Sequence, residues 1–514
     1  MSSSPLVVQA QPPANNPVRN GLPLSASKAM GKTVQLTLAD VIKLVLQGNR
    51  DLKNATLDRI VQRQELKEAE GKFSPTITPS FSFGVTKSFN TNSETSIPTD
   101  NGSSSGTSNS SNSSGDNVEN VVGTGSLGEQ NSSTTFSRDV QVSANLLTRI
   151  GTQLTLTVNP LSTQKLELSI AQPLLRGAGR LVNEASVKNA RFTEKQNILT
   201  LKQSVIDKLT ETIAAYRTLI KTQEAVRIQS LALNSKQKQL GFTKILVEAG
   251  RKAKVELVET QKSLADTEQS LGAARNSFAQ ANSDLLKLIE SNQPLNITVP
   301  QPDINALDNT VLPKIVRSPE DLVALAYQKR LDYQQAKIAI DTEKLNQRIA
   351  RNNQLWNLDL QGNTSLGESS QASASLVLKK TFGDRSVKTE VLRRRIGVLK
   401  NENRLAQLTD NIRREVSDRL RDIDSSLMQL KTAQQTREFA DRQLQVSQER
   451  FKRRGGQTTL FEIIQKQDDL VAAQNNELNT KIDYLNAITN LEKVVGLTLD
   501  TWKDLIAANQ SLIQ

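Results

Sequence analysis

The stretch GRKAKVELVETQKSLADTEQSL, residues 250–271, recurs later in the chain as GQTTLFEIIQKQDDL, residues 456–470. In both copies a glycine is followed by a short polar segment, then by Glu and an aliphatic residue, and then by a helix-forming segment rich in Gln and Leu. Four residues of the first copy recur 206 positions later: Gly250, Glu256, Gln261 and Leu264 match Gly456, Glu462, Gln467 and Leu470. The repeat predicts a duplicated chain with a helical hairpin turning at each glycine.

Apolar residues recur every seven positions after each glycine. In the first copy they are Leu257, Leu264, Leu271, Phe278 and Leu285, with Ala274, Ala281 and Leu288 three residues further on. In the second copy they are Ile463, Leu470, Tyr484 and Leu491, with Ala487 and Val494, and only Glu477 and Thr480 interrupt the stripe. A seven-residue apolar repeat is typical of a coiled coil.

Between the predicted helices the apolar period changes to two. Apolar and polar residues alternate in three stretches of the first half and two of the second: 76–88, 140–158, 166–170, 355–364 and 372–381. This pattern predicts strands with one apolar face. Such strands cannot stand alone in water or lipid, so we expect them to close into a barrel. One chain offers at least four strands, which is too few for a membrane barrel, so several chains are expected to pool theirs.

The pattern divides the chain into five segments: a disordered leader 1–35, a first repeat 36–293, a linker 294–318, a second repeat 319–499 and a C-terminal tail 500–514. The first repeat has strands at about 76–89 and 138–175, a Ser/Asn-rich loop 90–135 and a hairpin tip at Gly250. The second repeat has strands at about 355–381 and a tip at Gly455-Gly456. Helices are expected at 39–71, 182–249, 251–291, 319–352, 384–454 and 457–495.

Composition narrows the functional classes. The chain of 514 residues has neither His nor Cys, so it lacks the commonest general base, the commonest metal ligands and any disulfide. We therefore expect no enzyme, no cofactor and no metal site. The net charge is +12, but Lys and Arg are interleaved with Asp and Glu, which favours solvated helix faces over a nucleic-acid site. No apolar run reaches the length of a spanning helix, and residues 1–18 form no complete signal peptide.

From about Thr33 to Leu499 the chain resembles the TolC-like outer membrane efflux protein family. The residues that carry the resemblance are Leu36-Thr37-Leu38 before the first helix, Phe73-Ser74-Pro75 before the first strand, Gln172-Pro173-Leu174-Leu175-Arg176-Gly177 between strand and helix, and the duplicated Gly250…Glu256-Leu257-Val258 and Gly456…Glu462-Ile463-Ile464. Each piece is weak alone, and their order and duplication make the match specific.

The resemblance implies a mainly α-helical fold with a β-barrel portion, built from duplicated helix–β-hairpin–helix–tip–helix units. Three chains would form a homotrimer with a shared twelve-stranded barrel in the outer membrane, in contact with its lipid, and a coiled-coil tube crossing the periplasm. The tips would form an entrance that opens when a periplasmic adaptor and an inner-membrane transporter engage. The channel would conduct drugs, or proteins in type I secretion, passively. The substrate and the type of transporter, whether ABC, RND or MFS, stay open.

Two departures from the family concern the strands and the tips. Residues 138–158 add alternating segments, for which an extended extracellular hairpin is preferred to additional barrel strands. The family usually has Asp at the acidic tip positions, whereas this chain has Glu256 and Glu462.

Three carboxylates near the tips are candidates for a selectivity ring. Glu256, Glu259 and Glu462 lie just after the tip glycines, and three-fold symmetry would turn each into a ring of three that concentrates cations. The resemblance places Glu462 in such a constriction, with Gln465 in place of a second acid. Exposed Glu on a helix is otherwise commonplace, and without the resemblance no ring would be assigned.

Basic residues and glycines at the tips complete the candidate site. Lys452, Arg453 and Arg454 form a hypothetical latch that pairs with Glu256 or Glu259 on a neighbouring hairpin. They are equally consistent with favourable placement of cations at a helix C-terminus. Gly250, Gly455 and Gly456 are expected to cap helices in the left-handed conformation, and the resemblance adds contact with the adaptor.

One alternative function remains open, a soluble coiled-coil scaffold that forms no channel. It explains the heptads and the charge, but not the alternating strands or their duplicated placement. No spacing of carboxylates supports an enzyme.

Overall fold

The computed structural model of the chain describes residues 33–89, 132–162, 164–291, 295–304, 318–452 and 459–507. They belong to two compact units, and each unit takes segments from both halves of the sequence. The first, helical unit draws on residues 1–65, 191–342 and 397–514, and the second, mainly β unit on residues 66–190 and 343–396. The two repeats of the sequence are therefore interleaved rather than arranged as separate domains.

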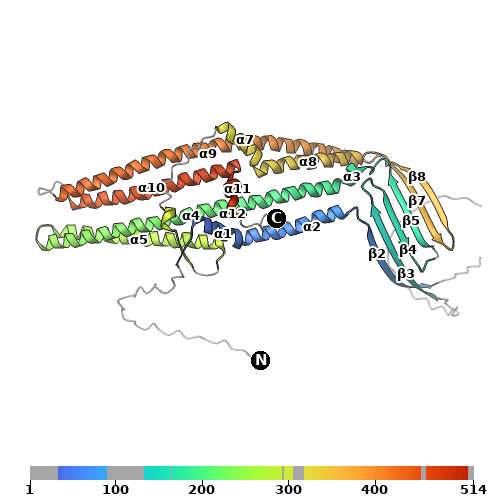
Figure 1. Ribbon diagram of the computed structural model, residues 1–514, viewed down its shortest axis with the longest axis horizontal. Helices are drawn as coiled ribbons and strands as arrows, with labels where there is room; N and C mark the ends of the chain where they lie inside the picture. The colour runs from blue at the N-terminus through green and yellow to red at the C-terminus, as the bar shows by residue number, and fades with distance from the viewer. Residues whose placement is uncertain are drawn as a thin grey trace, which may run out of the picture. The chain divides into compact units, whose positions relative to one another are not determined.

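The helical unit is built on two long helical hairpins. Helices α4 (Ala185–Glu248) and α5 (Lys254–Ile289) form the first, and α9 (Ser386–Lys452) and α10 (Leu460–Val495) form the second; in each hairpin the two helices lie side by side (Figure 1). Shorter elements complete the fold: β1 (Thr33–Gln35), α1 (Leu38–Gly48), α2 (Arg50–Gly71), β6 (Asn296–Thr298), α7 (Pro319–Lys329), α8 (Leu331–Asn352), α11 (Thr498–Thr501) and α12 (Lys503–Ala507). Helices α2, α4, α8 and α9 have residues in both units.

Both helices predicted to precede strands are broken. The helix expected at 39–71 is α1 and α2, separated at Asn49, and the helix expected at 319–352 is α7 and α8, separated at Arg330. Asn49 and Arg330 have extended backbone, with φ and ψ of −62° and 125° and of −63° and 130°. The break lets α1 turn its apolar residues Val41, Val45 and Leu46 into the core.

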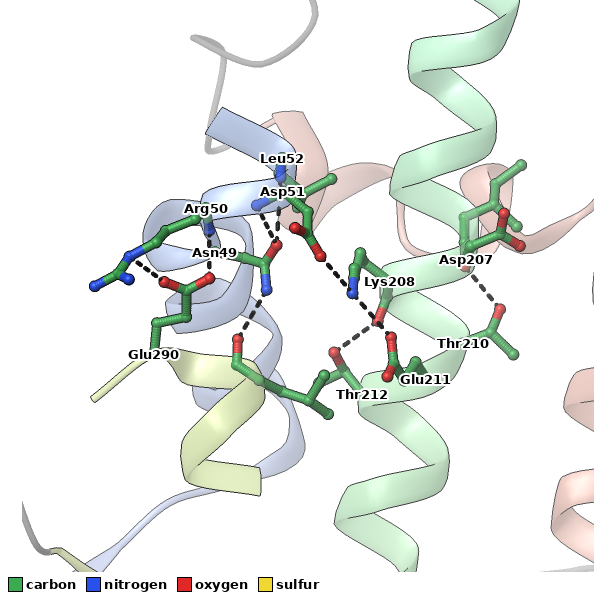
Figure 2. A network of polar contacts seen from close by, with 12 residues as sticks. Asn49, Arg50, Asp51, Leu52, Asp207, Lys208, Thr210, Glu211, Thr212 and Glu290 are labelled. Atoms are coloured by element: carbon green, nitrogen blue, oxygen red, sulfur yellow. Dashed lines mark hydrogen bonds and ion pairs between the residues drawn. The ribbon is translucent and has the colours of Figure 1, made fainter. Parts of the chain in front are cut away.

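A network of polar contacts surrounds the first break (Figure 2). The Asn49 Oδ1 accepts from the backbone N–H groups of Asp51 and Leu52 and so caps α2, while its Nδ2 donates to the Leu288 carbonyl at 3.2 Å. Lys208 in α4 reaches the Asp51 carboxylate at 2.9 Å. These bonds join α2, α4 and α5 at one point.

Three segments differ from the predicted organisation. Residues 33–35 of the expected leader form β1, which pairs in parallel with β6 inside the expected linker. Residues of the expected tail form α12, where Ile506 is buried against α1, α2 and α4. Alternation and heptad spacing give no signal for elements as short as these.

Apolar residues of the helical unit gather in three clusters. One joins α1, α4, α5 and β6 around Tyr216, Leu285 and Ile297. Another joins α7, α9 and α10 around Ile412, Leu430 and Val495. The third joins α1, α2, α4 and α12 around Leu52, Leu209 and Ile506. The predicted heptad stripes supply residues to the first two clusters, and Glu477, which interrupts a stripe, pairs with Arg437 in α9 at 2.6 Å.

The second unit contains one antiparallel sheet with the strand order β2-β3-β4-β5-β7-β8 (Figure 1). Its strands are β2 (Thr76–Phe89), β3 (Ser132–Leu147), β4 (Gln153–Val158), β5 (Gln164–Pro173), β7 (Asn357–Gly367) and β8 (Gln371–Lys379). A short helix, α3 (Arg180–Asn183), follows β5. The sheet therefore has two strands more than the minimum of four per chain that the sequence predicted.

The two additional strands come from residues 138–158. They lie in β3 and β4, which pair with each other and with β2 and β5 along the sheet. The preferred interpretation of this segment, a hairpin extending beyond the strands, is therefore corrected.

Candidate functional site

The first hairpin turns at Gly250, in the predicted left-handed conformation. Its φ is +68°, the Gly250 N–H donates to the Val247 carbonyl at 3.0 Å, and the Arg251 N–H donates to the Leu246 carbonyl at 2.9 Å. These two bonds form a Schellman cap, which satisfies the last carbonyls of α4. A Cβ added at Gly250 would meet no atom within 4 Å, so only the backbone conformation favours glycine there.

The three predicted carboxylates lie in different surroundings. Glu256, in the first turn of α5, pairs with Lys252 of its own hairpin. Glu462, in the first turn of α10, donates its backbone N–H to the Thr459 hydroxyl at 3.2 Å. Among the described residues, neither Glu259 nor Glu462 has a cation within ion-pair distance. The negative charge of Glu256 is thus offset within the chain, whereas those of the other two are not.

Aromatic contacts join the ends of the two hairpins. The Lys252 Nζ lies 5.3 Å from the ring centroid of Phe451 in α9. Phe451 in turn meets Phe242 of α4 edge-on, with 6.4 Å between centroids. A cation over a ring and an edge-on ring pair are both attractive, so the two tips of one chain are held together here.

Of the predicted latch, one residue lies in the described part of the chain. Lys452 pairs with Glu449, three residues earlier in α9, at 2.9 Å. Arg453, Arg454, Gly455 and Gly456 lie outside the described residues. The pairing of these cations with a neighbouring hairpin stays a prediction.

A groove of about 540 Å³ runs beside the tips between the two hairpins. Helices α4, α5 and α10 line it, and the side chains include Glu259, Asp266, Asp468 and Phe461. The phenyl ring of Phe461, next to Glu462, is exposed. The charged side chains of the groove are these three carboxylates and Lys262, which pairs with Asp266 at 3.1 Å.

Sequence patterns missed a buried lysine beneath this groove. Lys236 in α4 is fully buried, and its Nζ lies 2.8 Å from the Asp468 carboxylate and 3.4 Å from the Ile464 carbonyl. It follows the buried residues Ile228 and Ala232 at steps of four. A lysine in step with an apolar helix face is the signal that would have located it.

A second cation, the half-buried Arg217, joins α4 to α10. Its Nη1 donates to the Leu485 carbonyl, the Asn486 side chain and the Thr489 hydroxyl at 2.9 to 3.0 Å. Burial lowers the pKa of Arg217 to about 10, although nearby Glu492 opposes the shift. Burial also raises the pKa of Glu492, because it disfavours the charged carboxylate. Lys236 and Arg217 therefore both hold one hairpin of the chain to the other.

The two faces of the sheet differ in polarity. In register across it, the apolar face carries Phe81, Val140, Val142, Leu154, Leu156, Leu168, Ile170, Leu358, Leu360, Leu376 and Leu378. The opposite face carries Ser80, Gln141, Ser143, Thr155, Thr157, Ser169, Gln361, Asn363, Ser373 and Ser375. An apolar face directed outward and a polar face inward are the pattern of strands in membrane barrels.

Known proteins support this architecture. The profile of the family described as "Outer membrane efflux protein" matches residues 41–290, just under half of the chain. The match and the structures below confirm the resemblance to the TolC-like outer membrane efflux protein family, and the predicted location agrees with the family's description. The sequence matches no curated protein. In the described part of the chain, no helix is long and apolar enough to cross a membrane.

Solved structures with the same fold are outer membrane channels. The structure of CusC, described in terms of transmembrane channel formation, has a TM-score of 0.63 at 16% identity and covers 94% of this chain and 99% of its own. The Campylobacter jejuni CmeC outer membrane channel has a TM-score of 0.61 at 15% identity and 98% coverage of both chains. The Vibrio cholerae outer membrane protein VceC has a TM-score of 0.59 at 13% identity, with 89% of this chain and 96% of its own covered. At these identities the likeness shows the fold.

Proposed function

We propose that this chain, like the family that its residues 41–290 match, is an outer-membrane exit channel of a tripartite export system. Three copies would form the channel, which conducts small molecules or proteins passively. Channels of this family are homotrimers that work with adaptor proteins and inner-membrane transporters. The proposal extends this assembly to the present chain.

The observation that carries the proposal is the two-faced sheet. Its apolar face exposes large side chains at both edge strands, including Phe81, Phe83, Leu376 and Leu378. A patch of this kind on a protein in water would promote aggregation, whereas in lipid it is the favoured surface. The coiled-coil scaffold gives no account of this face.

At the entrance, Glu462 and Glu259 are proposed to form rings of carboxylates in the trimer. Both lack an ion-pair partner among the described residues, so each ring would attract cations. Glu256 is a weaker contributor, because Lys252 offsets its charge. The tip turns at Gly250, Gly455 and Gly456 are the proposed contacts with the adaptor.

Single-channel conductance in a planar bilayer tests the proposal. The wild-type protein is expected to give discrete, cation-selective openings. Glu462→Gln removes one charge per chain from the entrance and should weaken the cation selectivity. Glu268→Gln, which removes an exposed carboxylate in α5 about three turns beyond Glu256, is the control and should leave selectivity unchanged.

The outcomes test the channel and its carboxylate ring independently. Openings whose selectivity is the same in Glu462→Gln would keep the channel and remove the carboxylate ring. Protein that washes off membranes in high salt and gives no openings would favour the scaffold. For the proposed latch, Arg453→Ala should raise the open probability, and an unchanged conductance record would argue against it.

A further inference from the structure

We infer that Arg176 and Lys380 form a site for the phosphate of an anionic phospholipid, at the end of the sheet where its strands join the helices. The inference rests on the proposed function, because it takes the apolar face of the sheet as the face in contact with lipid. The helices of such a channel lie in the periplasm, so this end of the sheet lies at the periplasmic surface of the membrane.

The two cations flank an aromatic ring in the last row of the apolar face. In β7 this face ends with Leu358 and then Trp356. The Arg176 N–H donates to the Trp356 carbonyl at 3.1 Å, so the pairing of the β5 segment with β7 continues to this row. On the other side, Lys380 follows two residues after Leu378, which pairs with Leu358. The row therefore places one cation on each side of the tryptophan.

Polarity changes along this face as it does across a membrane surface. The row before the cations consists of Leu174, Leu358 and Leu378, and the Leu174 N–H donates to the Leu358 carbonyl at 2.7 Å. At the opposite end of the same strands, Leu166 lies beside Leu366. Acyl chains would contact the leucines, while the cations beyond them would meet headgroup phosphates.

An exposed aromatic pair fixes the depth of the cations. Trp356 is 44% exposed and meets Phe382, which is 78% exposed, edge-on with 5.8 Å between the ring centroids. The Lys380 Nζ lies 5.9 Å from the centroid of the Trp356 ring. Tryptophan is favoured at the level of lipid headgroups, because its ring is apolar and its N–H is polar. The rings therefore place the two cations where phosphates lie.

Both cations have hydrogen-bond donors to offer an anion. Among the described residues neither Arg176 nor Lys380 forms an ion pair. The Lys380 Nζ donates to the Gln354 carbonyl at 2.5 Å, which uses one of the three N–H groups of its ammonium. Asp384 is the carboxylate that Arg176 influences: hydrogen bonding from Ser386, helped by the charge of Arg176, lowers the pKa of Asp384. Its Oδ1 accepts from the Ser386 N–H at 2.8 Å.

Arg176 also lines a groove that a headgroup can enter. The groove has a volume of about 470 Å³, and its lining includes Ser386, Thr389 and Arg393. Arg393 pairs with Glu390, which lies in the same groove, so the uncompensated positive charge there belongs to Arg176. A guanidinium with nearby hydroxyl groups is well suited to phosphate oxygens.

Fluorescence quenching by brominated lipids tests the site in the full-length protein. The chain has two tryptophans, so Trp502→Phe leaves Trp356 as the only one. The protein is reconstituted in vesicles of phosphatidylcholine and phosphatidylglycerol, with bromine on the acyl chains of one lipid or the other. At equal lipid fractions, brominated phosphatidylglycerol is expected to quench Trp356 severalfold more strongly than brominated phosphatidylcholine.

Variants of the row assign the preference to its cations. Arg176→Gln and Lys380→Gln should each lower the preference for phosphatidylglycerol by up to about fivefold, and the double variant should bring the two lipids close to equal quenching. Lys379→Gln is the matched control, because Lys379 precedes Lys380 in the chain but pairs with Asn357 on the opposite face. It should leave the preference unchanged.

The outcomes distinguish this inference from the proposed function. Leu360→Trp, combined with Trp356→Phe and Trp502→Phe, reports on the apolar face itself. Quenching at position 360 together with equal quenching of Trp356 by the two lipids would overturn the phosphate site and keep the channel. An absence of quenching at position 360 by either lipid would overturn the proposed membrane channel.

Two further results would also overturn the lipid site. A preference that falls as much in Lys379→Gln as in Lys380→Gln would show that only the overall charge of the protein acts. A preference that inorganic phosphate abolishes, and chloride at the same ionic strength does not, would assign Arg176 and Lys380 to a free anion in place of a lipid.

Discussion

The two repeats break their first helix at equivalent positions but hold the break with different chemistry. Asn49 and Arg330 stand 281 positions apart. Asn49 is neutral and 3% exposed, and it donates to the Leu288 carbonyl. Arg330 is charged; it donates to the Val494 carbonyl at 3.3 Å and pairs with Asp332 at 2.7 Å. Leu288 and Val494 are themselves 206 positions apart, so the duplication kept the backbone acceptor and changed the donor.

The repeats also differ where α1 and α7 end against the last residues of α5 and α10. In the first repeat an added Cβ at Gly48 would lie 2.9 Å from the Ile289 carbonyl oxygen. In the second repeat the glycine is on the other partner: a Cβ at Gly496 would lie 3.0 Å from the carbonyl carbon and Cβ of Lys329. The close approach of two backbones is common to both repeats, and a glycine on either side permits it.

Glu290 occupies in the first repeat the place of Gly496 in the second. Both have a left-handed backbone, with φ of 56° and 82°. That conformation costs a non-glycine residue about 1 kcal/mol or more. The Glu290 carboxylate accepts from the Arg50 N–H at 2.7 Å and pairs with its guanidinium at 2.6 Å (Figure 2), which offsets part of this cost. Equivalent helices of the two repeats thus end either at a glycine, Gly496, or at a strained Glu290 that Arg50 holds by a hydrogen bond and an ion pair.

The largest loss of stability is expected for a substitution at Gly496. Gly496→Ala combines the cost of a left-handed alanine with a clash against the Lys329 backbone, and we expect a loss of about 3 kcal/mol in the free energy of unfolding. Chemical denaturation of the detergent-solubilised protein measures it. Gly250→Ala is the matched control, because it has the same conformation and open space around it. Its loss should be about 1 kcal/mol, and equal losses in the two variants would show that the close approach at Gly496 does not exist.

A smaller effect is expected at Asn49. Asn49→Ala removes the cap of α2 and leaves the Leu288 carbonyl without its donor, which together cost about 2 kcal/mol. The loss should be the same at low and high salt, because no ion pair is involved. Hydrogen exchange of the first turn of α2, with the first turn of α8 as reference, measures the local effect. Unchanged protection of α2 would contradict the capping role.

Much of the fold followed from periodicity in the sequence. The heptads after Gly250 predicted α5, and alternation predicted the strands with their apolar faces. The pattern did not predict the breaks at Asn49 and Arg330, because the apolar residues on either side keep a helical spacing. At Arg330 the break has no local signal, whereas Gly48-Asn49 is a helix-ending pair that apolar spacing alone does not take into account.

The candidate site was predictable in its position along the chain and not in its pairing. Gly250 was expected to be a left-handed cap and is one. The pairing of Glu256 with Lys252 follows the ordinary i, i+4 rule and was visible in principle. The partnership of Lys236 with Asp468 joins residues far apart in sequence, and only the packing of α4 against α10 reveals it.

The charged break in the second repeat is expected to respond to salt. Arg330→Gln removes the ion pairs with Asp332 and Glu415 but keeps a donor for the Val494 carbonyl. Because both carboxylates are partly exposed, we expect a loss of about 1.5 kcal/mol at low salt that shrinks in high salt. Denaturation curves at two salt concentrations measure it. A loss independent of salt would make the two breaks alike in chemistry and remove the contrast.

The smallest expected effect concerns the aspartates that the repeats share, Asp51 and Asp332. Asp332 pairs with Arg330, whereas Asp51 pairs with Lys208 in α4 at 2.9 Å (Figure 2). Hydrogen bonding to Asp51, with help from Glu211 and against the effect of burial, raises the pKa of Lys208 above its ordinary 10.5. A raised pKa means that this stabilisation is complete below the ordinary value and is lost as the pH rises through the raised one.

The wild type should therefore lose more stability than Lys208→Met on going from about pH 9 to about pH 12, by up to about 0.5 kcal/mol, because the pair is partly exposed. Subtracting the loss of Lys208→Met from the loss of the wild type cancels the contribution of every other group that titrates in this range. Arg330→Met should lose as much as the wild type over the same range, because a guanidinium keeps its charge there. Parallel losses in the wild type and Lys208→Met would show that the ammonium of Lys208 adds nothing to the first junction, which Asn49 and the pair of Arg50 with Glu290 would then hold.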